Sequence, residues 1–143
     1  MNDNVDKFDE YVECGEGWKS LYQPLIDFVR EYNKEHLPDS YIVINQIKEK
    51  FAGLRFYYDA YGVPRDITDK FDEMISEAEY KSFDICERCG NTENVGLAKG
   101  SGWYFTICED CLKKIAKTNN RTYSWMHDNV VYEINKDGKK KKV

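Results

Sequence analysis

Two Cys-x-x-Cys pairs restrict what this chain can fold into more than any other feature. They are Cys86/Cys89 and Cys108/Cys111, and 18 residues separate them. This spacing is typical of a four-thiolate zinc site, in which each pair supplies two ligands from one tight turn. The pattern predicts one structural Zn²⁺ per chain. Because four thiolates close the coordination shell, it does not predict zinc-based hydrolysis.

The size and composition favour a small folded protein. The chain has 143 residues, of which 41% are hydrophobic and 15% aromatic. This length and apolar content are enough for one domain, or for a small core with an attached module that a metal ion stabilises. No apolar run has the length of a membrane span, and the acidic start lacks the apolar stretch of a signal peptide. We therefore expect no membrane association and a cytoplasmic location, where paired cysteines bind metal rather than form disulfides.

The first half of the chain has the pattern of a helix, a β-hairpin and a second helix over residues 15–84, after an acidic arm at 1–14. Apolar residues recur with helical spacing from Trp18 onward and again over residues 67–82. We expect Asp66 or Thr68 to cap that second helix, whose outer face is acidic between Asp69 and Glu79. The β-branched and aromatic segments that predict the hairpin strands are residues 41–48 and 54–58, joined through Ala52-Gly53.

Residues 85–135 have the pattern of a four-cysteine zinc-finger module. A turn at Cys89-Gly90 precedes two short strands, 95–99 and 103–107, and Cys108 then opens a helix over 109–117. This order is that of a treble-clef finger, and a final strand VVYEI follows it. The lysine-rich tail, 136–143, is predicted to be disordered. The predicted fold class is α+β: a helix–β-hairpin–helix half packed on a treble-clef-like four-cysteine finger.

A candidate binding surface lies on the predicted hairpin. Gln46, Lys48, Arg55 and Tyr57 are placed to share one sheet face, where such groups hold a phosphate or stack on a base. A solvated sheet face without function is the commoner origin of such a pattern. The acidic helix face is the alternative surface, since it resembles nucleic acid in charge and suits a basic groove on another protein.

We find no catalytic residues. Cys14 lies outside the CxxC pairs, and no motif connects it with His36 or His127, so these three are expected to be ordinary core or surface residues. The glycine-rich, nucleophile and metalloprotease motifs that identify common enzyme classes do not occur. The sequence therefore favours a non-catalytic protein over an enzyme.

The charge distribution bears on the partner. The net charge is −5, and the last eight residues carry five lysines but only one acid, so the finger itself lacks a basic stripe. We therefore expect a non-catalytic, zinc-stabilised interaction module that binds a protein, either a host protein or another copy of itself. A nucleic-acid-binding finger is the first alternative, and a nucleotide- or small-ligand-binding protein is the second. The sequence does not fix the oligomeric state.

One further resemblance rests on several motifs together. The segments GEGW at 15–18, QIKEKFAGLRFYY at 46–58, ICERCG at 85–90 and GWYFTICEDC at 102–111 resemble a group of small, uncharacterised bacterial and phage or prophage proteins. That group shares a QxKEKFGGLRFY-like stretch ahead of a paired-CxxC finger, and this chain has Ala52 where the group has glycine. The resemblance implies the same architecture and a phage-linked setting in a host cytoplasm. In such a setting a phage-encoded inhibitor or regulator of a host protein is the expected role.

Overall fold

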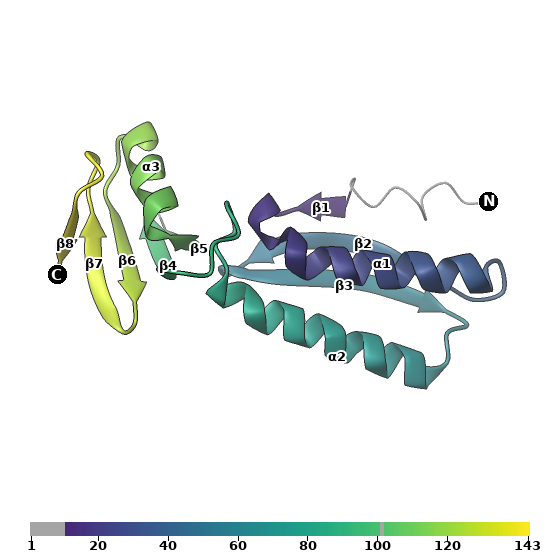
Figure 1. Cartoon of the computed structure of the whole chain (residues 1–143). Coiled ribbons are helices and arrows are strands. Elements are labelled where there is room, and N and C mark those ends of the chain that lie inside the picture. Colours follow the sequence, from purple (N-terminus) through teal and green to yellow (C-terminus); the bar gives the residue numbers. More distant parts are fainter. Residues whose placement is uncertain (1–10, 101) are drawn as a thin grey trace.

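The structure, a computed structural model, describes residues 11–100 and 102–143. Within them the chain forms three α-helices and two β-sheets, which confirms the predicted α+β class (Figure 1). Of the predicted acidic arm, residues 1–10 lie outside the described part, as does Ser101. The elements are β1 (Val12–Glu13), α1 (Lys19–His36), β2 (Tyr41–Lys50), β3 (Gly53–Tyr61), α2 (Arg65–Lys81), β4 (Val95–Gly100), β5 (Trp103–Cys108), α3 (Glu109–Asn119), β6 (Tyr123–His127), β7 (Val130–Ile134) and β8 (Lys140–Lys142), with short 3-10 helices at Glu16–Trp18 and Ser82–Asp84.

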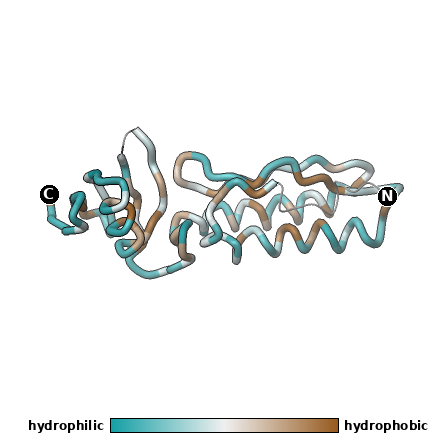
Figure 2. Tube along the Cα trace, turned by 90° about the horizontal axis from the view of Figure 1, so that it is seen from above, coloured by the Kyte–Doolittle hydropathy of each residue, from teal (hydrophilic) through white to brown (hydrophobic). Residues whose placement is uncertain are grey.

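The first half is a two-layer structure. Strands β1, β2 and β3 form a sheet in that order, with β1 parallel and β3 antiparallel to β2. Helices α1 and α2 lie side by side on one face of this sheet (Figures 1 and 2). Phe71 of α2 is fully buried there, stacked on Phe28 of α1 and in edge contact with Phe56 of β3. The apolar side of each helix therefore faces the sheet, and within residues 11–100 and 102–143 no helix packs on the opposite sheet face.

The beginning of α2 differs from the prediction. The helix starts at Arg65, and Pro64 is its N-cap residue, so neither Asp66 nor Thr68 caps it. The carbonyl of Pro64 accepts hydrogen bonds from the amides of Ile67 and Thr68. Pro64 itself has extended backbone, with ψ of 147°, and its carbonyl supplies the first acceptor of the helix, which explains the earlier start.

The acidic side of α2 faces solvent as predicted except at Glu79, whose side chain is partly buried. The Glu79 carboxylate accepts a hydrogen bond from the Phe56 amide at 3.0 Å, and Asp72 accepts one from the Tyr58 hydroxyl at 2.5 Å. The Ser82 hydroxyl accepts a third from the Leu54 amide at 2.9 Å. Ser82 and Glu79 therefore satisfy two backbone amides on the outer edge of β3, at Leu54 and Phe56.

The turn between β2 and β3 has an unusual composition. Lys50 pairs with Gly53, so Phe51 and Ala52 form a two-residue loop. Both have positive φ, 53° and 71°, as a type I′ turn requires. Asparagine and glycine normally occupy such positions, because other side chains collide with the backbone there. The Phe51 side chain is nevertheless 74% exposed.

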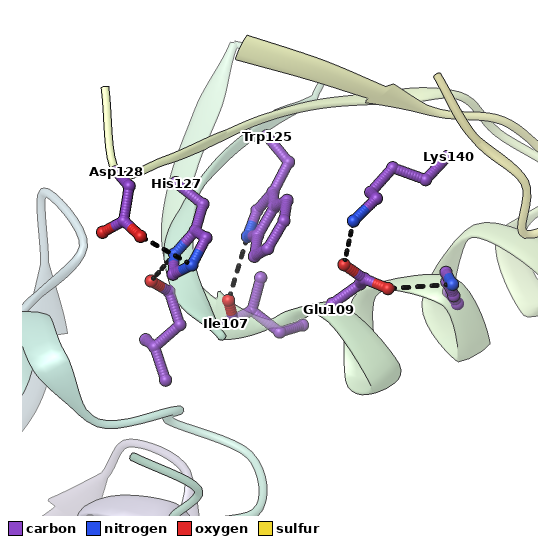
Figure 3. Close-up of polar contacts among 8 residues, drawn as sticks. Ile107, Glu109, Trp125, His127, Asp128 and Lys140 are labelled. Carbon is purple, nitrogen blue, oxygen red and sulfur yellow. Dashed lines mark hydrogen bonds and ion pairs between the residues drawn. The ribbon is translucent and has the colours of Figure 1, made fainter. Parts of the chain in front are cut away.

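The second half is a five-stranded sheet in the order β5-β4-β6-β7-β8, with α3 packed against it. Trp125 is buried in its core, and its indole N–H donates to the Ile107 carbonyl at 3.1 Å (Figure 3). The tail was predicted to be disordered, and this is wrong. Residues 140–142 form strand β8 on β7, and the Lys140 ammonium lies 2.6 Å from the Glu109 carboxylate.

Candidate metal centre and neighbouring surfaces

Four cysteines from three parts of the chain meet at one point. Cys86 and Cys89 follow the Ser82–Asp84 turn, Cys108 ends β5, and Cys111 lies in the first turn of α3. Their sulfur atoms all lie within 4.8 Å of one another, and those of Cys89 and Cys108 are 3.7 Å apart. A tetrahedron of sulfurs about 2.3 Å from a central metal ion has edges of about 3.8 Å. The donor set therefore fits a four-coordinate metal ion.

The turn that carries the first two cysteines is held by backbone hydrogen bonds. The amide of Gly90 donates to the Cys86 carbonyl, and the amide of Cys86 donates to the Asn91 carbonyl, both at 2.9 Å. Gly90 has φ of 80°, a conformation that glycine adopts without a steric penalty. The Asn91 amide consequently points at the Cys89 sulfur, 3.4 Å away. Such an N–H group stabilises negative charge on a sulfur ligand.

The electrostatics of the four thiols call for a cation. Desolvation opposes ionisation of Cys89, yet the Asn91 amide and the neighbouring thiols lower its pKa. Desolvation is the main cause that raises the pKa of Cys108 and of Cys111. The neighbouring cysteines raise the pKa of Cys111 further, whereas the hydrogen bonds from Cys111 oppose the rise at Cys108. Four thiolates this close repel one another unless a positive ion lies between them. A divalent metal ion held by the four sulfurs would supply that charge.

The Gly15–Trp18 segment docks directly on the Cys86–Gly90 turn. The Gly17 amide donates to the Glu87 carbonyl at 2.8 Å, and the Trp18 indole N–H donates to the Ile85 carbonyl at 2.8 Å. A β-carbon on Gly17 would lie 2.1 Å from the Cys86 carbonyl oxygen, so only glycine permits this approach. The turn that carries Cys86 and Cys89 is therefore also a contact between the two halves of the molecule.

A second link runs from the same turn to the β2–β3 loop. The Glu87 amide donates to the Thr106 carbonyl at 3.2 Å, and the Thr106 hydroxyl donates to the Ala52 carbonyl at 2.7 Å. Thr106 is buried. The finger thus contacts the first half at the Gly15–Trp18 segment and at the hairpin loop.

Cys14 and the two histidines do not join the cysteine cluster. Desolvation, with the charges of Glu87 and Glu49, raises the pKa of the Cys14 thiol to about 12, so it is protonated at neutral pH. His127 donates from Nδ1 to the Val95 carbonyl at 2.9 Å, and its Nε2 lies 3.3 Å from the Asp128 carboxylate (Figure 3). His36 donates from Nδ1 to the Tyr32 carbonyl. Burial thus accounts for Cys14, and hydrogen bonds to backbone carbonyls account for the two histidines.

The structure places the four candidate residues of the hairpin as cross-strand neighbours. Gln46 lies opposite Tyr57, and Lys48 lies opposite Arg55. Two of the four have other contacts: the Gln46 amide donates to Glu13 at 3.1 Å, and Arg55 forms an ion pair with Glu79 at 3.8 Å. Lys48 has no ion-pair partner within residues 11–100 and 102–143.

Beside this face is a cleft that the sequence analysis did not identify. It has a volume of about 350 Å³ and lies between the β2–β3 loop and the β4–β5 hairpin. Phe51 and Trp103, which are 74% and 66% exposed, line it together with the half-exposed Tyr104. The available signal was an aromatic residue beside each of two predicted turns. It could not show that turns about 50 residues apart in sequence meet.

Comparison with protein-family models, curated proteins and solved structures finds no match to this chain. Among the described residues, no helix combines the length and the apolar character needed to cross a membrane. Functional conclusions therefore rest on the site itself.

Proposed function

We propose that the protein is a non-catalytic binding module in which a structural Zn²⁺ ion, held by Cys86, Cys89, Cys108 and Cys111, joins two folded halves. The observation that carries this proposal is the cluster of four sulfurs with a spacing suited to tetrahedral coordination. Zinc is the metal that closed four-thiolate sites select most often. The turn, hairpin and helix around the site follow the order of a treble clef.

A closed thiolate shell argues for a structural role. Zinc that activates water keeps an open coordination position, which four sulfur ligands do not leave. The site also supports the contact with the Gly15–Trp18 segment, so the metal stabilises more than its own loop. This arrangement suits a scaffold that presents surfaces to a partner.

The partner that we propose is a protein, engaged through the acidic side of α2. Asp69 and Glu73 are exposed there, and Glu77 is exposed although it pairs with Lys81. A row of carboxylates on a rigid helix complements a basic groove. The resemblance to phage and prophage proteins supports a host protein as the target and regulation or inhibition as the role.

Native mass spectrometry tests the metal assignment. The purified protein is expected to carry one zinc ion per chain, and Cys86→Ser is expected to lose it together with thermal stability. Cys14→Ser is the matched control, because Cys14 lies outside the cluster, and it is expected to retain the ion. Zinc content and stability that are unchanged in Cys86→Ser would reject the proposal.

The partner assignment needs a separate experiment. Proteins captured by the wild type are compared with those captured by an Asp69→Asn/Glu73→Gln variant at low and at physiological salt. A specific partner is expected to be lost from the variant and to be retained by the control Ser76→Ala, an exposed uncharged position on the same helix. A partner captured equally by all three proteins would show that this helix face is not the binding surface.

A further inference from the structure

We propose that the cleft between the β2–β3 loop and the β4–β5 hairpin binds single-stranded nucleic acid by stacking bases on Phe51, Trp103 and Tyr104. This function goes beyond the proposed protein interaction and uses a different surface. The helices cover one face of the first sheet, whereas the β4–β5 hairpin extends toward the opposite side (Figure 2). Residues of this hairpin and of the β2–β3 loop line the cleft.

The first argument is the exposure of the aromatic side chains. The chain has three tryptophans, and two of them, Trp18 and Trp125, are 0% and 1% exposed. Trp103 is instead 66% exposed and Phe51 is 74% exposed, and both line one cleft. Large apolar side chains that gather on the surface without covering one another are typical of binding sites. Flat aromatic rings provide platforms for bases of any sequence.

The second argument is the backbone at Phe51. A bulky residue with φ of 53° is strained relative to asparagine or glycine. Burial does not offset this strain, because the ring is directed largely to solvent. The type I′ turn therefore presents an aromatic ring at the edge of the cleft at the expense of stability, as expected for a residue retained for binding.

The third argument is charge. Lys48 and Lys50 line the cleft, and within residues 11–100 and 102–143 neither forms an ion pair. The Lys50 ammonium lies 5.6 Å from the centre of the Phe51 ring, and the Lys99 ammonium lies 5.3 Å from that of Tyr104. The acidic residue of the cleft, Glu49, accepts a hydrogen bond from the Ala52 amide.

These groups favour one ligand class. Ammonium groups beside exposed rings fit a strand whose bases stack while its phosphates meet the lysines. A cleft of about 350 Å³ is too small for a duplex but suits one or two unstacked bases. A larger hollow of about 580 Å³ at the other end of α1 is lined by Glu31, Glu35 and Asp66, so it is unsuited to a polyanion.

Fluorescence titration tests the proposal on the full, zinc-loaded chain. The probe is a labelled oligothymidylate of about twelve nucleotides, within the range that single-strand-binding sites cover. We expect salt-dependent binding by anisotropy, with parallel quenching of the exposed Trp103. Trp103→Ala and Phe51→Ala are each expected to weaken binding about tenfold, and Trp103→Phe is expected to restore most of it. Lys48→Gln is expected to reduce the slope of log K against log salt by about 0.7.

The controls separate this site from other sources of binding. Tyr80→Ala and Lys70→Gln change an exposed aromatic and a lysine on α2, and they are expected to have no effect. Each of four outcomes would overturn the proposal: no binding at low salt, binding insensitive to Trp103→Ala and Phe51→Ala, loss of binding only in Lys141→Gln/Lys142→Gln, or displacement by poly-glutamate as efficient as by oligonucleotide. The last outcome would indicate an acidic protein ligand. Zinc content is independent of all four, so the metal assignment is judged separately.

Discussion

Gly17 occupies a position where no side chain fits. A β-carbon there would lie 2.1 Å from the Cys86 carbonyl oxygen and 2.5 Å from that of Glu87. Both atoms belong to the backbone of the metal-binding turn, so they cannot rotate away as a flexible side chain would. The lack of a side chain at this single residue therefore determines how closely the first half approaches the cysteine-bearing turn.

We predict that Gly17→Ala destabilises the protein by about 1–3 kcal/mol, as overpacking of a tight contact does. Urea unfolding of the zinc-loaded protein measures this change. Glu16→Ala alters the exposed neighbouring side chain and is expected to remain within about 0.5 kcal/mol of wild type. Equal stability of the two variants would show that the segment does not dock as described.

Cys14 provides a prediction about pH. Its thiol has a pKa raised to about 12 by desolvation and by the charges of Glu87 and Glu49. Because the thiolate is the reactive form, alkylation of Cys14 by iodoacetamide is expected to be very slow at pH 8 and to accelerate as the pH rises toward that value. Mass spectrometry of the native protein is expected to find Cys14 unmodified, and the unfolded protein is expected to react readily. Fast labelling in the native state would contradict the burial of this thiol.

Among the elements, the β2–β3 loop combines a strained backbone with the exposed ring that we propose binds nucleic acid. Phe51 has positive φ and is exposed, so its ring adds little to the core. Asparagine tolerates this conformation, and we predict that Phe51→Asn raises the free energy of unfolding by about 1 kcal/mol while it weakens oligonucleotide binding. Urea unfolding and anisotropy measure the two effects. Tyr57→Asn, an exposed change within β3, is expected to lower stability instead.

The elements that the sequence predicts correctly are those with local signals. The helical spacing from Trp18 and the alternating hairpin strands depend on neighbours within a few residues, and the structure contains α1, β2 and β3 there. The spacing of the two CxxC pairs predicts a four-cysteine cluster, and in the structure the four sulfur atoms lie within 4.8 Å of one another. The positions of Gln46, Lys48, Arg55 and Tyr57 follow from strand alternation, whereas their role in binding stays a prediction.

What the sequence did not predict depends on distant partners. The lysine run looks disordered by composition, but β8 pairs with β7 and Lys140 contacts Glu109, 31 residues away. The caps expected for α2 were wrong because Pro64 already begins the helix. The aromatic cleft requires two hairpin turns to meet, and no local pattern encodes that contact.

At the scale of the whole molecule, the cysteine cluster lies at the contact between the two halves. Each half has its own apolar core, one around α1, α2 and the first sheet and the other around Trp125. The Gly15–Trp18 segment and Thr106 connect them next to the cysteines. Loss of the metal is therefore expected to affect both cores.

We predict that chelation of zinc lowers the thermal stability of the whole chain. Trp18 is fully buried beside the metal-binding turn, so its emission is expected to shift to longer wavelength as the metal leaves. Trp103→Phe removes the exposed tryptophan and makes this signal easier to assign. An emission spectrum that stays constant while zinc is removed would show that the halves are independent. Readdition of zinc is expected to reverse the change.

The contact between Gly15 and Glu87 spans 72 residues, which has a consequence for how the protein is made. During synthesis, α1 and the first hairpin are made before the residues on which Trp18 and Gly17 dock. Cys86 and Cys89 then emerge with only half of a coordination shell, and Cys108 and Cys111 follow one hairpin later. The nascent chain thus acquires its final shape late, when the second cysteine pair arrives, and a premature stop before Cys108 leaves a fragment that cannot complete its metal site.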